Sequence, residues 1–312
     1  CDAYRDVEGP FLRLFRKYWP DCPFEVVFVS ETESANGKGC RFDREIMCGV
    51  GGNWCSRLVK ALDEISTPYV LMLCDDYYLE KSVDTDLFKK RLAQAKQFDA
   101  VNLRMIPNPP TGRPYRDGLL EYQKQTAYCI ATQAGIWNRS FLRGLADGLA
   151  SIWEFERYGS FMVGTEKRPL LVTPTKEFPF VDAVHKGCWE KFGVEVCREN
   201  GIELDFSVRG LPPFKVRVRE WLKGLVFAIF PWTFIVRIQN LFDLGHQVEG
   251  IAAGAVHLIY KDHHRRRTHT ADIHQLQGLR LDTLRSVDYD DNRIDCCQRA
   301  VCILGKILVT RG

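Results

Sequence analysis

Two adjacent carboxylates, Asp75 and Asp76, directly follow an apolar run in this sequence. The uncharged residues 70–74 are typical of a strand buried on both faces, as in the interior of a parallel sheet. Ligands of open α/β sheets collect beyond the carboxyl ends of such strands. Adjacent carboxylates repel each other unless a cation, a proton or a hydrogen-bond donor compensates them. The pair is therefore a candidate site for a hard divalent cation, a kind of ion that also binds phosphate oxygens.

Two further acids alternate with aromatic residues in the segment Trp153-Glu154-Phe155-Glu156. An apolar setting raises the pKa of a carboxyl group toward the range useful for a general base. The alternative is an ordinary pair of acids at the start of a helix. We expect a catalytic carboxylate here and prefer Glu156, with Glu154 left open.

Two more groups stand where a site around the carboxylate pair could use them. Glu31 follows an expected strand at residues 24–30, and side chains at such a position can hydrogen-bond a nucleotide base or ribose. A solvated acidic loop is the alternative. His185 and Lys186 form the other group, because His is a frequent metal ligand and Lys can neutralise phosphate charge. A structural His is equally compatible with the sequence.

Alternating helices and strands must position these residues. Apolar spacing predicts strands at 24–30, 70–74, 99–104, 127–132 and 169–173, and helices at 8–18, 53–65, 83–98 and 138–149. Asn53 can cap the second of these helices. Strands that alternate with helices indicate the α/β class. Residues 107–114, rich in Pro, Asn, Thr and Gly, predict a loop long enough to be a lid or an acceptor loop.

Composition sets wide limits on the class of protein. A chain of 312 residues with 46% hydrophobic residues can bury a large core, and a net charge of +3 is too small to predict nucleic-acid binding. The 12 cysteines are scattered without a CxxC pair, which suits reduced thiols in a cytosolic protein. No stretch is long enough to span a bilayer. The opening Cys1-Asp-Ala-Tyr4 resembles a loop after a strand, so we expect a first strand wholly or partly upstream.

The pattern changes after about residue 208, which predicts a main domain at 1–208 followed by a helical appendage. Residues 224–236, GLVFAIFPWTFIV, are uncharged and have basic flanks. Such a block in residues 209–250 favours an amphipathic segment in the plane of a membrane surface, with a core helix pair broken at Pro231 as the alternative. Residues 251–312 are basic and His-rich and of uncertain fold; we prefer a solvated loop there over a metal or polyanion site.

Together these segments resemble bacterial family 2-like glycosyltransferases of the GT-A fold, especially those of capsule and lipopolysaccharide biosynthesis. The resemblance covers about residues 1–202, and its markers are Cys1-Asp-Ala-Tyr4, residues 53–58, residues 67–79 and residues 153–156. It implies a GT-A (Rossmann-like) fold, with a mostly parallel central sheet flanked by helices. It also implies an inverting hexosyltransferase that moves a sugar from a nucleotide-diphosphate donor to a glycan or a lipid-linked glycan.

The resemblance also implies roles for single residues. Asp75 and Asp76 would take the place of the DxD motif that holds Mg²⁺ or Mn²⁺ against the pyrophosphate of the donor. Because this chain has DD instead of DxD, His185 could supply a missing metal ligand. Glu154 or Glu156 would be the base that takes the proton from the acceptor hydroxyl.

The remaining roles concern the nucleotide sugar and the place of the enzyme. Glu31 would lie near the nucleotide base, Asn53 and Arg57 near the nucleotide or the diphosphate, and Lys186 could partly replace the cation. The partners implied are the donor, a glycan or lipid-linked acceptor, and the inner membrane surface through a peripheral contact; nucleic acid is not among them. The expected location is the cytoplasm, or the cytoplasmic face of the inner membrane.

Two other functions use the same features. A nucleotidyltransferase also needs carboxylates and Mg²⁺, but it predicts a Gly-rich phosphate loop with Lys or Arg after the first strand, and none is visible. A non-catalytic module could bind a membrane or a polyanion through the basic residues 215–219 and 263–267.

Overall fold

A computed structural model describes residues 4–35, 42–214, 216, 218 and 306–309. The chain divides into two compact units, residues 1–214 with 296–312 and residues 215–295. The first unit extends past the predicted boundary at residue 208, and Arg209 gives a reason. Its guanidinium donates to both carboxylate oxygens of Asp6 at 2.8 and 3.0 Å and lies 4.2 Å from the ring centre of Tyr4. The uncharged block at 224–236 lies outside the described residues.

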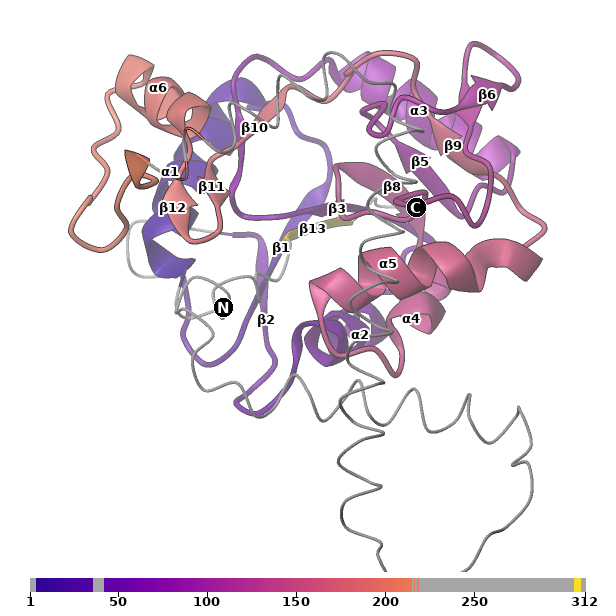
Figure 1. Cartoon of the computed structure of the whole chain (residues 1–312), viewed down its shortest axis with the longest axis horizontal. Helices are drawn as coiled ribbons and strands as arrows, with labels where there is room; N and C mark the ends of the chain where they lie inside the picture. The colour runs from indigo at the N-terminus through magenta and orange to yellow at the C-terminus, as the bar shows by residue number, and fades with distance from the viewer. Residues whose placement is uncertain (1–3, 36–41, 215, 217, 219–305, 310–312) are drawn as a thin grey trace, which may run out of the picture. The chain divides into compact units, whose positions relative to one another are not determined.

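A mixed sheet of nine strands, in the order β2-β1-β13-β3-β8-β5-β9-β7-β6, forms the centre of the first unit (Figure 1). Parallel pairing joins β1 to β2 and β5 to β9, whereas the other neighbours are antiparallel. The α/β class is therefore confirmed, and the prediction of a mostly parallel sheet is wrong. The strands are β1 (Glu25–Ser30), β2 (Arg44–Met47), β3 (Tyr69–Leu73), β5 (Asn102–Arg104), β6 (Arg113–Pro114), β7 (Leu120–Glu121), β8 (Gly135–Asn138), β9 (Leu170–Val172) and β13 (Lys306–Val309).

Strand β13 brings part of the C-terminal region into the middle of this sheet. It runs antiparallel to β1 on one side and to β3 on the other, so that Leu308 stands opposite both Val26 and Leu71. Four residues of the region whose fold the sequence left uncertain thus belong to the first unit. Its backbone pairs with the facing edges of two strands that are otherwise not neighbours.

Helices cover both faces of the sheet (Figure 1). The helices are α1 (Arg5–Tyr18), α2 (Trp54–Glu64), α3 (Thr85–Gln97), α4 (Arg139–Ala146), α5 (Ile152–Met162) and α6 (Lys191–Glu199). Side chains of α1, α3 and α6 join one hydrophobic cluster, and those of α2, α4 and α5 join the other. The arrangement is a layered one, with the sheet between two sets of helices.

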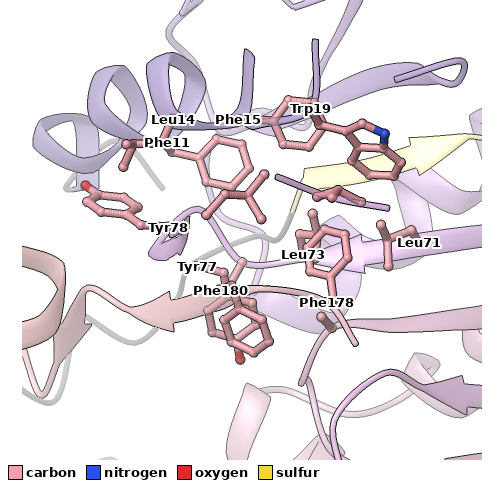
Figure 2. Packing of buried hydrophobic residues seen from close by; sticks show 14 of the residues in the cluster. Phe11, Leu14, Phe15, Trp19, Leu71, Leu73, Tyr77, Tyr78, Phe178 and Phe180 are labelled. Atoms are coloured by element: carbon pink, nitrogen blue, oxygen red, sulfur yellow. The ribbon is translucent and has the colours of Figure 1, made fainter. Parts of the chain in front are cut away.

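The alternation of side chains along β3 explains how one strand serves both clusters. Leu71 and Leu73 belong to the cluster under α1, whereas Val70 and Met72 belong to the one under α2. Figure 2 shows part of the first cluster, in which Phe11 and Phe15 of α1 and Trp19, the residue after α1, pack together with Leu71 and Leu73. All five residues of β3 are buried, as an uncharged run predicts.

Polar caps set the starts of four helices. The side chains of Asn53, Asp84, Asn138 and Ser151 accept a backbone N–H three residues ahead, at the starts of α2, α3, α4 and α5. The cap predicted at Asn53 is therefore confirmed. Helix α5 was not predicted, although its cap Ser151 with Glu154 three residues on is the S-x-x-E pattern of a helix start.

The strand predicted at 127–132 is absent from the described sheets, and β8 begins only at Gly135. The backbone of Gln125 and Tyr128 has positive φ, which extended strands do not adopt. Cys129 and Ile130 are buried without being a strand, because they pack in the cluster under α5. An apolar run alone does not tell a buried loop from a buried strand.

The chain also forms two small antiparallel sheets that are separate from the large one. One pairs β4 (Tyr77–Leu79) with β10 (Phe180–Asp182), and the other pairs β11 (Val184–His185) with β12 (Cys188–Trp189). None of the helices described is long and apolar enough to cross a membrane. The described cysteines form no disulfide bonds with one another; they are Cys22, Cys48, Cys55, Cys74, Cys129, Cys188 and Cys197.

Candidate functional site

The two adjacent carboxylates occupy the turn that follows β3, as the sequence predicts. Strand β3 ends at Leu73, and the Tyr77 N–H closes the turn on the carbonyl of Cys74 at 3.1 Å before β4 begins. Asp75 is 0% exposed and Asp76 is 9% exposed. Burial of two neighbouring carboxylates is costly, so they mark this end of β3 as a place where charge has to be compensated.

Glu156 is the carboxylate of α5 that faces into the protein. Its Oε1 accepts two hydrogen bonds from Thr132, one from the backbone N–H and one from Oγ1, both at 2.8 Å. Burial raises the pKa of Glu156, while the two hydrogen bonds from Thr132 and the charge of Arg104 act against that rise. A carboxylate with a raised pKa and a fixed orientation has the properties of a general base.

Glu154 has a different role, although it lies only two residues away. Its Oε2 accepts the backbone N–H of Ala150 at 2.8 Å, and its own N–H donates to Oγ of Ser151 at 3.1 Å. Both hydrogen bonds lie at the start of α5, where an acid also interacts favourably with the helix dipole. The choice that the sequence left open therefore falls on Glu156 as the candidate base.

The three carboxylates Asp75, Asp76 and Glu156, named here the acidic cluster, act on one thiol. Burial raises the pKa of Cys74 well above its usual value, and the charges of Asp76, Asp75 and Glu156 raise it further. The hydroxyl of Tyr77, the residue after Asp76, is 3.5 Å from the carbonyl of Thr132, at the outer limit for a hydrogen bond. Residues about 80 positions apart are thus brought to the same end of the sheet.

A second group, named here the ion-pair cluster, consists of Glu31, Asn53 and Arg57. Nη1 of Arg57 forms a short ion pair with Oε1 of Glu31 and donates to the carbonyl of Gly52 at 2.6 Å. Oδ1 of Asn53 accepts the N–H of Ser56 at 2.8 Å and so caps α2. The three residues predicted to contact the nucleotide do lie together, but Arg57 and Glu31 largely neutralise each other.

His185 and Lys186 lie on the hairpin formed by β11 and β12. Both are exposed, and Lys186 and Gly187 form its turn with φ values of 49° and 76°. The N–H of Ala183 donates to the carbonyl of Asp76 at 2.7 Å, so the chain leading to the hairpin runs beside the acidic cluster. The backbone that leads to the hairpin thus lies near the acidic cluster, whereas the side chains of His185 and Lys186 are exposed.

The predicted set of three metal ligands, Asp75, Asp76 and His185, is not assembled. Within residues 4–35, 42–214 and 306–309, no group of three or more His, Cys, Asp or Glu side chains could hold a metal ion. Two buried carboxylates still fit the chemistry of Mg²⁺, because that ion keeps several waters and is often held by one or two carboxylates plus substrate phosphates. A cation at Asp75 and Asp76 stays a prediction.

Thr132 and Arg104 are site residues that the sequence did not reveal. Thr132 lies at the end of the wrongly predicted strand, and the residues next to it in the sequence do not indicate that it contacts α5. Arg104, fully buried at the end of β5, donates to the carbonyls of Asn108, Tyr128 and Cys129 at 2.5, 3.1 and 2.8 Å. A charged residue at the end of a predicted strand was the one available signal for Arg104.

Comparison with known proteins identifies no relative of this chain. No family model matches it, and neither a curated protein nor a solved structure is similar to it at a significant level. The chemistry of the site therefore has to be argued from its own residues.

Proposed function

We propose that this protein is an inverting glycosyltransferase of the GT-A type, which moves a sugar from a nucleotide-diphosphate donor to a hydroxyl of a glycan or lipid-linked glycan. The observation that carries the proposal is the acidic cluster. It combines a buried pair of carboxylates at the end of β3 with a third carboxylate, Glu156, whose pKa is raised. Such a transfer needs both a site for the diphosphate with its cation and a base for the acceptor.

The proposed reaction is a single displacement. The acceptor oxygen forms a bond to the anomeric carbon of the donor while the bond from that carbon to the diphosphate oxygen breaks. Glu156 takes the proton of the attacking hydroxyl, and the nucleoside diphosphate leaves with the bonding electron pair, so the anomeric configuration inverts. Asp75 and Asp76 would hold Mg²⁺ or Mn²⁺, which stabilises negative charge on the departing diphosphate.

A lipid-linked acceptor at the inner membrane surface is part of the proposal. Exposed apolar side chains gather late in the first unit, at Phe206, Val208, Leu211 and Phe214. The uncharged block at 224–236 follows shortly after along the chain, with Lys223 and Arg237 at its ends. Apolar residues flanked by basic ones favour binding to the headgroup region of an anionic membrane.

The test of the reaction is a screen of UDP-, GDP- and TDP-sugars with and without Mn²⁺, with release of nucleoside diphosphate as the readout. We expect release from at least one donor and a fall of 100-fold or more, about 3 kcal/mol of transition-state stabilisation, in Asp76→Asn. Asp86→Asn is the matched control, because the side chain of Asp86 is 97% exposed. Unchanged release in Asp76→Asn would overturn the role of the carboxylate pair.

The same screen separates the rival functions. Release of sugar 1-phosphate in place of a nucleoside diphosphate, with the nucleoside monophosphate passing to the acceptor, would identify nucleotidyl transfer. Tight binding to vesicles of anionic lipid without binding of any nucleotide sugar would identify a non-catalytic membrane module.

A further inference from the structure

The segment before β8 forms hydrogen bonds with α5 at two successive turns of the helix. Thr132 holds Glu156 through its N–H and Oγ1. One turn further along α5, Oγ of Ser160 accepts the N–H of Ile130 at 3.0 Å and donates to the carbonyl of Glu156 at 2.7 Å. Thr132 is 4% exposed and Ser160 is 2% exposed. Thr132 is therefore fixed by its surroundings and not by Glu156 alone.

Both hydrogen bonds from Thr132 reach the same oxygen of Glu156. Oε1 has two donors at 2.8 Å, whereas no hydrogen bond to Oε2 is recorded in the part of the chain that the structure describes. Glu156 is also not fully enclosed, since its side chain is partly exposed. The two oxygens of this carboxylate are therefore not equivalent.

We propose that Thr132 is a positioning residue that occupies Oε1 of Glu156 and leaves Oε2 as the atom that takes the proton of the acceptor hydroxyl. This assignment rests on the proposed function, since it names the accepting atom of the same base. A carboxylate with one oxygen anchored presents its other oxygen in a defined direction, which is what general base catalysis requires.

The groups around Glu156 determine how Thr132 affects its protonation. Arg104 on β5 favours the charged form of Glu156, as do the hydrogen bonds from Thr132. The charges of Asp76, Asp75 and Glu156 raise the pKa of the buried Cys74, and burial also raises the pKa of Tyr77. Because the hydroxyl of Thr132 donates to Glu156 and favours its charged form, loss of this hydroxyl should leave Glu156 protonated over a wider pH range.

The experiment compares Thr132→Val, which removes the hydroxyl at similar volume, with Thr132→Ser, which keeps it. We expect the acid limb of the pH–rate profile to move up by about one pH unit in Thr132→Val, a tenfold loss of rate at pH values below the limb. Thr132→Ser should follow the wild type. Thr132→Ala provides a second hydroxyl-free variant if Thr132→Val folds poorly. Equal acid limbs in the variants with and without the hydroxyl would overturn the proposal.

A titration without any sugar separates this inference from the proposed function. The carboxyl carbon of Glu156, followed by NMR in ¹³C-labelled protein and assigned from the signal lost in Glu156→Gln, should titrate at higher pH in Thr132→Val than in the wild type. If no nucleotide sugar is turned over, the proposed function fails, while this titration still decides whether Thr132 controls the protonation of Glu156. An unchanged titration contradicts the inference even in an active enzyme.

Discussion

The ion-pair cluster and the acidic cluster both contain charged residues at strand and helix ends. The ion-pair cluster pairs opposite charges, whereas the acidic cluster consists of three carboxylates. In the ion-pair cluster, Arg57 is only 3% exposed and its charge is matched by Glu31, within hydrogen-bond distance. In the acidic cluster, the charges of Asp76, Asp75 and Glu156 all raise the pKa of Cys74, and burial raises the pKa of Glu156. Matched charges stabilise a local structure, whereas accumulated like charges cost stability and are kept where chemistry needs them.

The largest effect should separate the two acids of α5. Glu156→Gln keeps the shape of the side chain but removes the base, so we expect turnover of the nucleotide sugar to fall by about 10³-fold with donor binding retained. Glu154→Gln is the matched control and should keep most of the activity, because its partners lie at the helix start. Steady-state kinetics and donor titration by calorimetry check both. Full activity in Glu156→Gln would move the role of base away from this residue.

Breaking the ion-pair cluster should mainly reduce stability. Arg57→Met removes the cation that pairs with the partly buried Glu31, and we expect the free energy of unfolding to fall by about 2–3 kcal/mol. Arg16→Met is the comparison, since Arg16 pairs with Asp43 in an exposed position and its loss should cost about 0.5 kcal/mol. Urea denaturation measures both. Equal losses in the two variants would show that burial of the Arg57–Glu31 pair does not increase its contribution to the free energy of unfolding.

Loss of the helix cap should have a smaller effect. Glu154→Ala removes the acceptor of the Ala150 N–H, and we expect a loss of about 1 kcal/mol in the free energy of unfolding, without a change in the pH–rate profile. Thermal unfolding together with the pH–rate profile measures both quantities. A shift of the profile in Glu154→Ala would mean that the two acids of α5 are coupled.

The smallest effect concerns stability as a function of pH. Because the pKa of Glu156 is raised above 4.5 in the folded protein, the folded state binds this proton more tightly than the unfolded state. The contribution of Glu156 is thus most favourable at low pH and is lost as the pH rises through the folded-state pKa. Glu156→Gln should be slightly more stable than the wild type at pH 7 to 8, and the gain should vanish below about pH 4.5. Urea denaturation at both pH values checks this; a gain that is the same at both would contradict the raised pKa.

Local sequence signals predicted the elements that frame the site. The uncharged run before Asp75 predicted the buried strand β3, and Asn53 predicted the start of α2, because both signals depend on residues next to one another in the chain. The S-x-x-E pattern at Ser151 and Glu154 was equally local and could have predicted α5. Signals of this kind need no knowledge of the rest of the fold.

Local sequence signals could not predict the direction of the strands. Whether β8 runs parallel or antiparallel to β3 depends on how the chain returns between them, and an apolar pattern has the same period in either direction. The insertion of β13 between β1 and β3 joins residues more than 200 positions apart. The prediction of a mostly parallel sheet failed for this reason.

The sequence by itself determined the α/β class, the position of Asp75 and Asp76 after a buried strand, and the presence of two acids, Glu154 and Glu156, among aromatic residues. Only the tertiary structure decided which acid of that pair could act as a base, because Thr132 and Arg104 reach Glu156 from other elements, whereas Glu154 bonds within its own turn. The physical reason is that the pKa and orientation of a side chain depend on desolvation and on neighbours in space. The order of residues along the chain does not specify those neighbours.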